Sequence, residues 1–319
     1  MLPDQGAWLS HYFFHAGGIY TEACDEVVLE AVEPFVRLCQ ARGWIGAWFF
    51  IRYTENGQHH VRLRVHGAPE VLERDVTPAL RGHLAALFPG VVEGVPDGSS
   101  PLSAPGVTHH AAVPYEPETD RYGGPEGVRL AEALFHRSSE AALALLGRTR
   151  PGARSSRLGK ALLAAVVLVH AFHESPAEGS DFLRTYETVY LRMLAGDGER
   201  RAAWLEAFTE GYQQQAGGLG AQVAECWRRL DAGDPLSPEL DRYRDDVREI
   251  RTSFQGLHEA GRLASGGAPL RAWRDAVLAI VPSYLHMMNN RLGINLQEEA
   301  YVAHLVRRAL DGRPAPTGA

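Results

Sequence analysis

A pair of strands joined by a tight turn constrains the fold of this chain most strongly. Residues 58–66 alternate strictly, with valine or leucine at positions 61, 63 and 65 and polar side chains between them. Period-two alternation is typical of a strand that buries one face. Asn56-Gly57 precedes this segment and favours a hairpin with the aromatic segment 44–53. We therefore expect a sheet built around this hairpin.

The polar face of the second strand carries His60, Arg62, Arg64 and His66 and contains no acidic residue. Arginine presents a planar, permanently charged set of donors that matches a carboxylate or a phosphate. This face is therefore a candidate anion-binding site. For an Arg-x-Arg strand taken alone, a solvated basic surface would be the better interpretation.

The register of the hairpin determines which side chains join these arginines. A loop with an odd number of residues would place Phe49 and Ile51 with the apolar residues of the second strand. It would also place Arg52 beside His60 and Arg62, so that three arginines share a face. We favour this register because it separates apolar from polar side chains.

The rest of the chain predicts an α+β fold. Strands are expected at 7–15 and 107–115, helices at 25–42 and 69–88, and a long Gly/Pro/Ser-rich loop at 89–106. After residue 122 the pattern becomes helical, and the predicted helices are 125–146, 158–174, 181–195, 200–215, 223–230, 238–263, 270–292 and 296–310. We predict a sheet-and-helix part at 1–122 and a helical part at 123–310 that form one domain, followed by a flexible tail at 311–319.

Composition excludes several classes of protein. The net charge of −7 argues against bulk attraction to nucleic acid. The three cysteines, Cys24, Cys39 and Cys226, have no spacing typical of a disulfide framework or a zinc site. No secretion signal is visible, and the longest apolar stretch, 161–171, is too short to span a bilayer. We expect a cytoplasmic protein without a metal ion.

Two further clusters could carry chemistry. Glu118 and Arg121 precede Tyr-Gly-Gly, where Glu118 could orient an arginine and the glycines permit close backbone approach. A turn with a surface ion pair is the alternative. On a helix, His286 would share a side with Asn289 and Asn290, which suits a positioned acid or base. A buried structural histidine is the alternative there. No phosphate-binding loop, dinucleotide fingerprint or nucleophile elbow is present.

Taken in order, these segments resemble the C-terminal elimination domain of class I lanthipeptide dehydratases, which also occurs as a free-standing protein in thiopeptide gene clusters. The resemblance extends from about Trp8 to Leu310. The segments that carry it are Phe49-Phe50-Ile51-Arg52-Tyr53, His60-Val61-Arg62-Leu63-Arg64, Glu118-x-x-Arg121-Tyr122-Gly123-Gly124 and His286-x-x-x-Asn290-Arg291-Leu292-Gly293. The chain departs from the family pattern at Ser138-Ser139, where an Asp-Ser pair is expected and where we predict a structural role.

The resemblance implies a lyase that removes glutamate from glutamylated Ser or Thr of a ribosomal precursor peptide and leaves dehydroalanine or dehydrobutyrine. The long glutamylation region of the full dehydratases has no counterpart here. The chain thus resembles a split eliminase whose partner is a separate glutamylation protein dependent on glutamyl-tRNA. No cofactor, direct nucleic-acid contact or membrane is expected, and both a homodimer and a hetero-oligomer remain open.

Five residues match the family positions associated with elimination: Arg62, Arg64, Glu118, Arg121 and His286. Arg52, His60, Asn290 and Arg291 are predicted to bind substrate. The base is either His286 or His60, and the site is expected where the sheet meets the helical part. The alternative functions are a thiopeptide pyridine synthase, which performs a formal [4+2] cycloaddition with leader release, and a non-catalytic subunit that presents the peptide.

Overall fold

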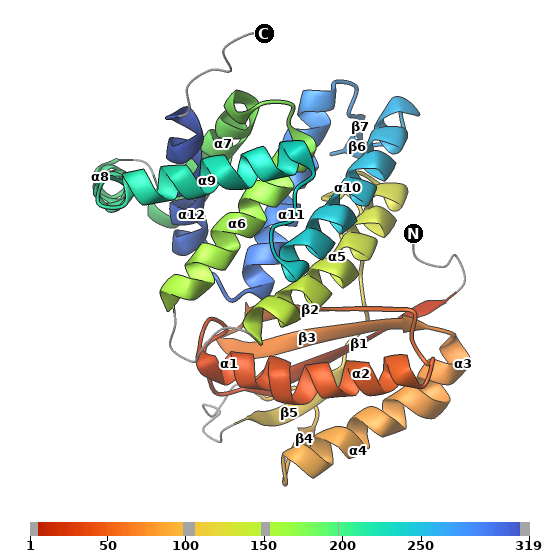
Figure 1. The fold of residues 1–319 in the computed structure, drawn as a ribbon. Coiled ribbons are helices and arrows are strands. Elements are labelled where there is room, and N and C mark those ends of the chain that lie inside the picture. The colour runs from red at the N-terminus through yellow and green to blue at the C-terminus, as the bar shows by residue number, and fades with distance from the viewer. Residues whose placement is uncertain (1–5, 98–105, 148–153, 197, 313–319) are drawn as a thin grey trace. The chain divides into compact units, whose positions relative to one another are not determined.

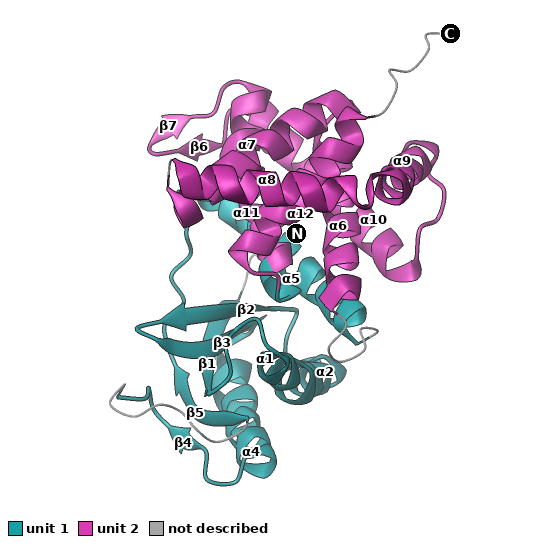
Figure 2. Cartoon of the chain, turned by 90° about the vertical axis from the view of Figure 1, so that its left-hand side faces the viewer, with its two compact units in different colours: residues 1–152, 290–293 teal, residues 153–289, 294–319 magenta. Residues whose placement is uncertain are grey.

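A computed structural model describes residues 6–97, 106–147, 154–196 and 198–312. The chain forms two units, residues 1–152 with 290–293 and residues 153–289 with 294–319 (Figure 2). The first unit contains a five-stranded sheet, and the second is almost entirely helical (Figure 1). This confirms the predicted α+β class. The first unit also takes in the first long helix of the predicted helical part, since it extends beyond residue 122.

The sheet follows the strand order β2-β3-β1-β5-β4. All neighbouring strands are antiparallel except β4 and β5, which are parallel. The strands are β1 (Ala7–His15), β2 (Ala47–Glu55), β3 (Gln58–Gly67), β4 (Val92–Glu93) and β5 (Val107–Ala112). Strand β4 lies within the segment predicted as a loop, and β5 ends before Tyr115.

The hairpin register differs from our prediction. Asn56 and Gly57 have φ values of 52° and 76°, so a two-residue turn joins β2 to β3 and Glu55 pairs with Gln58. Two positive φ values in succession match the right-handed twist of the strands, which explains the Asn-Gly sequence. The even loop pairs Arg52 with Val61. The predicted odd register is therefore wrong, and Arg52 lies on the face opposite the two arginines of β3.

One face of the sheet is covered by two helical segments. The first is α1 (Glu22–Glu26), η1 (Val27–Val32) and α2 (Glu33–Ala41), and the second is α3 (Pro69–Val71), η2 (Leu72–Val76) and α4 (Thr77–Leu87). Figure 1 shows α2 crossing the front of the sheet. The apolar residues of β3 are almost fully buried on this side. Both predicted helices are thus confirmed, and each contains a π-helical stretch.

The outer edge of β2 is closed by side chains instead of another strand. Helix α5 (Pro125–Leu146) and the end of α11 (Trp273–Arg291) supply the partners, with His136 at Trp48, Ser139 at Phe50 and Asn290 at Arg52. The Asn290 amide accepts from the Arg52 N–H at 2.9 Å and donates to the Arg52 carbonyl at 2.8 Å. A buried edge strand needs such partners because unpaired backbone groups away from water are costly.

The second unit contains the remaining helices and a short hairpin that the sequence did not predict. The hairpin is β6 (Ala264–Ser265) and β7 (Ala268–Pro269), and the helices are α6 (Arg154–Phe172), α7 (Pro176–Ala195), α8 (Glu199–Gln213), α9 (Ala216–Ala232), α10 (Pro238–Glu259), α11 and α12 (Leu296–Asp311). By length and composition α6 could cross a membrane, but most of it is buried in this unit, as is usual for a core helix. Residues 313–319 of the predicted tail lie outside the described residues.

The sheet contains buried histidines whose low pKa should make the folded chain less stable in acid. Burial, with the neighbouring His110, lowers the pKa of His11 to about 3, and burial, with His59, lowers the pKa of His15 to about 4. The unfolded chain binds protons below about pH 6.5 that the folded chain cannot bind, so stability must fall as pH drops from 6.5 toward 4. Each histidine contributes about 1.4 kcal/mol per pH unit in this window.

Urea unfolding at pH 7, 6, 5 and 4 checks this expectation. The variant His15→Phe should show a shallower loss of stability with falling pH than the wild type. His258→Gln, which removes a partly exposed histidine of the second unit, is the matched control and should retain the wild-type slope. Identical slopes for His15→Phe and the wild type would contradict the prediction.

The closed edge of β2 gives a second expectation. Asn290→Ala leaves the buried N–H and carbonyl of Arg52 without these partners, which should lower the free energy of unfolding by about 2 kcal/mol or more. Denaturant titration of this variant and of Gln214→Ala, which removes an exposed side-chain amide, measures the difference. Equal stability of the two variants would show that the Asn290 bonds do not hold the edge.

Candidate functional site

The face of β3 that carries the arginines is lined by aromatic rings from both neighbouring strands. The register places Tyr53 of β2 and Tyr12 of β1 on this face. The guanidinium carbon of Arg62 lies 3.6 Å from the ring centroid of Tyr53 and 4.6 Å from that of Tyr12. Such contacts attract a cation through the π-electrons of the ring. The aromatic residues of β2 therefore support the arginines, which the odd register would have prevented.

Arg62 is also held by polar partners. Its Nε donates to His60 Nε2 at 3.0 Å, and its Nη2 lies 3.2 Å from a carboxylate oxygen of Glu55. Because His60 Nε2 accepts this bond, the proton of the imidazole is on Nδ1, which faces the Gln58 carbonyl. Burial, with the adjacent Arg62, lowers the pKa of His60 to about 4. His60 is thus neutral, but its lone pair is engaged by Arg62.

Arg64 has no hydrogen-bond or ion-pair partner among the described residues, although it is only 8% exposed. Its guanidinium carbon lies 4.6 Å from the ring centroid of Tyr115 and 5.2 Å from that of Phe49. Burial lowers the pKa of Arg64, and the smaller effects of Tyr115, Tyr12 and Glu118 oppose it. A buried cation without a counter-ion is costly, so this guanidinium is suited to receive an anion.

The loop between β5 and α5 presents the second predicted cluster. Glu118 and Arg121 form an ion pair at 2.9 Å, and both side chains are exposed. The backbone folds into a turn there, since the Arg121 N–H donates to the Glu118 carbonyl. Gly123 and Gly124 have φ values of 89° and 96°, which glycine adopts without strain. The structure therefore brings Glu118 and Arg121 together as expected.

In the second unit, His286 of α11 forms a dyad with a buried carboxylate. Its Nδ1 lies 3.0 and 3.1 Å from the two carboxylate oxygens of Glu299, whose side chain is fully buried on α12. Tyr186 of α7 donates its hydroxyl to the same carboxylate at 2.5 Å. Burial and the adjacent Glu299 raise the pKa of Tyr186, which keeps this hydroxyl protonated. The tautomer that carries its proton on Nδ1 donates to Glu299 and leaves a lone pair on Nε2.

The other predicted binding residues have structural partners in the first unit. The fully buried Arg52 pairs with Asp25 at 2.7 Å and donates to the Ile19 and Arg291 carbonyls. Arg291 is equally buried and donates to Ser138 and Ser139. Asn290 closes the β2 edge. The structure thus separates Arg52 from the arginine face, and Ser138-Ser139 has the structural contacts that we predicted.

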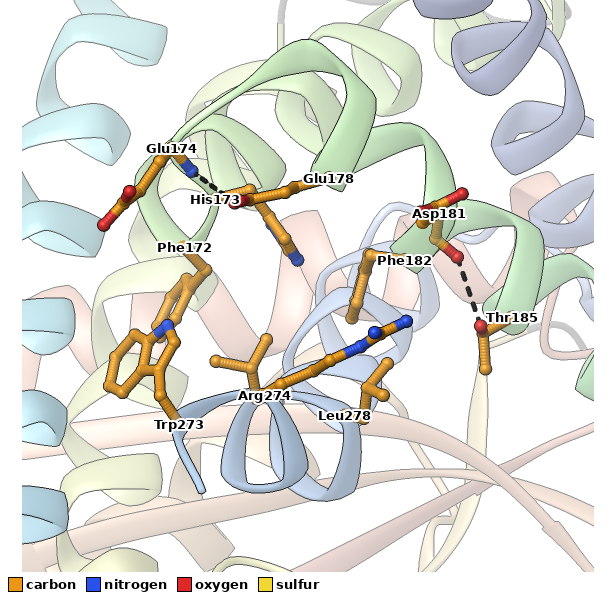
Figure 3. Close-up of a pocket in the computed structure, with 11 residues that line it drawn as sticks. Phe172, His173, Glu174, Glu178, Asp181, Phe182, Thr185, Trp273, Arg274 and Leu278 are labelled. Carbon is orange, nitrogen blue, oxygen red and sulfur yellow. Dashed lines mark hydrogen bonds between the residues drawn. The ribbon is translucent and has the colours of Figure 1, made fainter.

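A pocket of about 320 Å³ lies in the second unit at the start of α7 and α11 (Figure 3). Phe172, Phe182 and Trp273 contribute aromatic walls, and His173 points into the space between them. None of the predicted catalytic residues lines this pocket. Among the described residues, no group of three or more His, Cys, Asp or Glu side chains could hold a metal ion.

The family model "Lantibiotic biosynthesis dehydratase C-term" matches residues 8–310. The chain belongs to this family. Its members include dehydratase elimination domains. None of the curated proteins matches the sequence at a significant level.

Solved structures show the same fold over nearly the whole chain. TsrL is 18% identical with a TM-score of 0.71, and the match covers 96% of this chain and 95% of TsrL. The pyridine synthase TbtD from thiomuracin biosynthesis is 21% identical with a TM-score of 0.71, covering 95% of this chain and 97% of TbtD. The tRNA-dependent lantibiotic dehydratase MibB from Microbispora sp. 107891 is 21% identical with a TM-score of 0.65, covering 97% of this chain but 28% of MibB.

The sequence analysis did not identify four residues that hold Arg64 and His286 in place. These are Tyr115 and Glu132 beside Arg64, and Tyr186 and Glu299 beside His286. Glu299 follows the capping box of α12, so in the sequence it resembles an ordinary acid in the first turn of a helix. Only the packing of α12 against α11 and α7 reveals it as a partner of His286.

The dyad predicts a fixed tautomer. In the wild type, ¹⁵N NMR of the imidazole should show the proton of His286 on Nδ1. Glu299→Gln should weaken this preference because a neutral amide accepts a weaker hydrogen bond than a carboxylate does. The buried His304–Glu187 pair serves as an internal reference whose signals should not change. An unchanged His286 tautomer in the variant would contradict the role of Glu299.

Proposed function

We propose that this chain eliminates glutamate from glutamylated Ser or Thr residues of a ribosomal precursor peptide. The observation that carries the proposal is Arg64, a buried guanidinium beside a second arginine, with no direct hydrogen-bond or ion-pair partner in the described part of the chain. Family membership supplies the reaction class. The glutamyl ester carries one free carboxylate and elimination generates a second, and arginine binds carboxylates well.

The reaction requires three events. A base removes the Cα proton, the Cβ–O bond breaks, and the electron pair of that bond leaves with the carboxylate of glutamate, while a Cα=Cβ double bond forms. We assign Arg62, Arg64 and Arg121 to binding glutamate and stabilising the negative charge that develops on the departing carboxylate. Glu118 orients Arg121 through the observed ion pair.

We assign His286 as the base. Glu299 fixes the proton of its Nδ1 and stabilises the imidazolium that forms, which leaves Nε2 to accept the Cα proton. His60 is the weaker candidate because its lone pair already accepts a hydrogen bond from Arg62. The assignment of His286 and the arginine face to the same reaction rests on the family resemblance.

We further propose that a separate glutamylation protein supplies the substrate. The resemblance of the sequence motifs to the free-standing elimination domain supports this proposal, and the match with the tRNA-dependent dehydratase MibB covers 28% of that protein. The partner would transfer glutamate from glutamyl-tRNA, and this chain would act on the glutamylated peptide.

A pyridine synthase is the second candidate function, because TbtD matches this chain over almost its full length. The presence of the whole set of Arg62, Arg64, Glu118, Arg121 and His286 favours elimination. A synthase would join two dehydroalanines and release the leader peptide. A third possibility, a subunit that only presents the peptide, would leave the substrate unchanged.

Mass spectrometry of a glutamylated precursor peptide incubated with the protein separates these functions. We expect loss of glutamate and formation of dehydroamino acids. Arg62→Ala, Arg121→Ala and His286→Ala should accumulate the glutamylated peptide, with elimination by His286→Ala slower by about 10²–10⁴-fold. Arg74→Ala, which removes an exposed arginine paired with Asp75, is the matched control and should behave as wild type.

Unchanged dehydration in all three variants would contradict the assigned residues. Leader release with macrocyclisation would show the synthase, and binding without a change in mass would show the presenting subunit. Either of these outcomes would overturn the proposed elimination.

A further inference from the structure

Arg64 differs from Arg52, Arg62 and Arg121 of the first unit in how its charge is held. Arg52 pairs with Asp25, Arg62 with Glu55 and Arg121 with Glu118. Arg64 is as inaccessible as a core residue, yet within the described part of the chain its contacts are aromatic rings. An ion pair would occupy N–H donors of a guanidinium. A ring that attracts the cation through its π-electrons leaves those donors available.

Tyr115 makes the shorter of these ring contacts, and its place depends on a tether. It lies after the end of β5, so no strand pairing fixes it. Its hydroxyl donates to a carboxylate oxygen of Glu132 at 2.8 Å. Burial, with the adjacent Glu132, raises the pKa of Tyr115, so the hydroxyl remains a donor. The ring also contacts Trp8 and Phe49 edge-on, with centroid separations of 5.8 and 6.1 Å.

Glu132 completes this arrangement from α5. The side chain is 5% exposed, and it accepts hydrogen bonds from Tyr115 and Trp8. Burial raises the pKa of Glu132, while these hydrogen bonds and the nearby Arg64 counteract the effect. Glu132 thus interacts with Arg64 electrostatically, but its oxygens bond the tyrosine and the tryptophan. The Tyr115 side chain therefore separates the negative charge of Glu132 from the guanidinium of Arg64.

We propose that Tyr115, anchored by Glu132, is a positioning residue that holds Arg64 charged and leaves its donors for the carboxylate of the substrate. The inference rests on the proposed function for the identity of that carboxylate. The Tyr115 ring holds the Arg64 guanidinium in place, and the hydrogen bond to Glu132 holds the ring. The Glu132 carboxylate offsets the charge of Arg64 without competing with the ligand for its N–H donors. A direct Arg64–Glu132 pair would instead occupy part of the donors of this guanidinium.

Binding of free glutarate, measured by calorimetry, tests the arrangement apart from catalysis. Tyr115→Leu removes the ring and should weaken glutarate binding about tenfold. Tyr115→Phe keeps the ring but loses the tether, and Glu132→Gln keeps an acceptor but loses the charge. We expect both to weaken binding about threefold and to raise KM for the glutamylated peptide more than they lower kcat.

Tyr212→Phe is the matched control. Tyr212 also lies against an arginine, Arg308, at 5.6 Å, and donates its hydroxyl to the Arg308 carbonyl in the second unit. This variant should bind glutarate as the wild type does. If Tyr115→Leu does not fold, Tyr115→Phe and Glu132→Gln decide the question, since both nearly preserve side-chain volume.

Wild-type glutarate affinity in both conservative variants would overturn the inference, whatever their thermal stability. If both variants bind glutarate as the wild type does and the wild type eliminates glutamate, the proposed function holds and only the positioning role of Tyr115 is contradicted. Weakened glutarate binding in the variants of a protein that never eliminates glutamate would support the positioning role and contradict the proposed function. The two failures are therefore distinguishable.

Discussion

The two-residue turn at Asn56-Gly57 is the constraint on which the arginine face depends. Side chains on a strand alternate between faces, so the number of residues in the turn decides which half of β2 joins Arg62 and Arg64. The even turn brings Phe49 and Tyr53 to the arginines and sends Arg52 to the opposite face. A turn with one more residue would replace aromatic rings by a third cation and disperse the cluster through charge repulsion.

The same residue type has different partners within one unit. Arg52 is neutralised by Asp25 in the core, and Arg62 shares its donors between His60 and Glu55. Arg64 lies against the rings of Phe49 and Tyr115, and the Glu132 carboxylate supports Tyr115 by accepting a hydrogen bond from its hydroxyl. Charge alone therefore does not mark a binding residue in this sheet. The absence of a direct ion pair among the described residues distinguishes Arg64 from the structural Arg52.

Much of the fold was predictable because local patterns determine it. The alternation in β3, the Asn-Gly turn and the helical periodicity of α5 and α12 each specify an element from neighbouring residues. The register was not predictable from hydrophobicity, since both faces of β2 are apolar: Trp48 and Phe50 on one, Phe49 and Ile51 on the other. The Asn-Gly sequence indicates a two-residue turn and so the even register, whereas our prediction relied on the hydrophobic pattern.

The candidate site was predictable in its charged residues but not in their supports. Arg62, Arg64, Glu118 and Arg121 stand in short motifs, whereas Tyr115, Glu132 and Glu299 gain their roles only from tertiary packing. Glu299 lies 13 positions beyond His286 on a different helix, a separation for which no local rule exists. Likewise, the pairing of Asn290 with Arg52 spans 238 positions, and the sequence suggested a substrate contact there instead.

Closure of the β2 edge by His136, Ser139 and Asn290 restricts how a peptide can dock on this sheet. Many proteins recognise extended peptides by adding them as a further strand, which requires free backbone groups along an edge. The N–H of Phe50, both backbone groups of Arg52 and, through His136 Nδ1, one backbone group of Trp48 are already bonded. A peptide therefore cannot pair with these backbone groups as an added strand, and any peptide that binds at this edge must be held there through side-chain contacts.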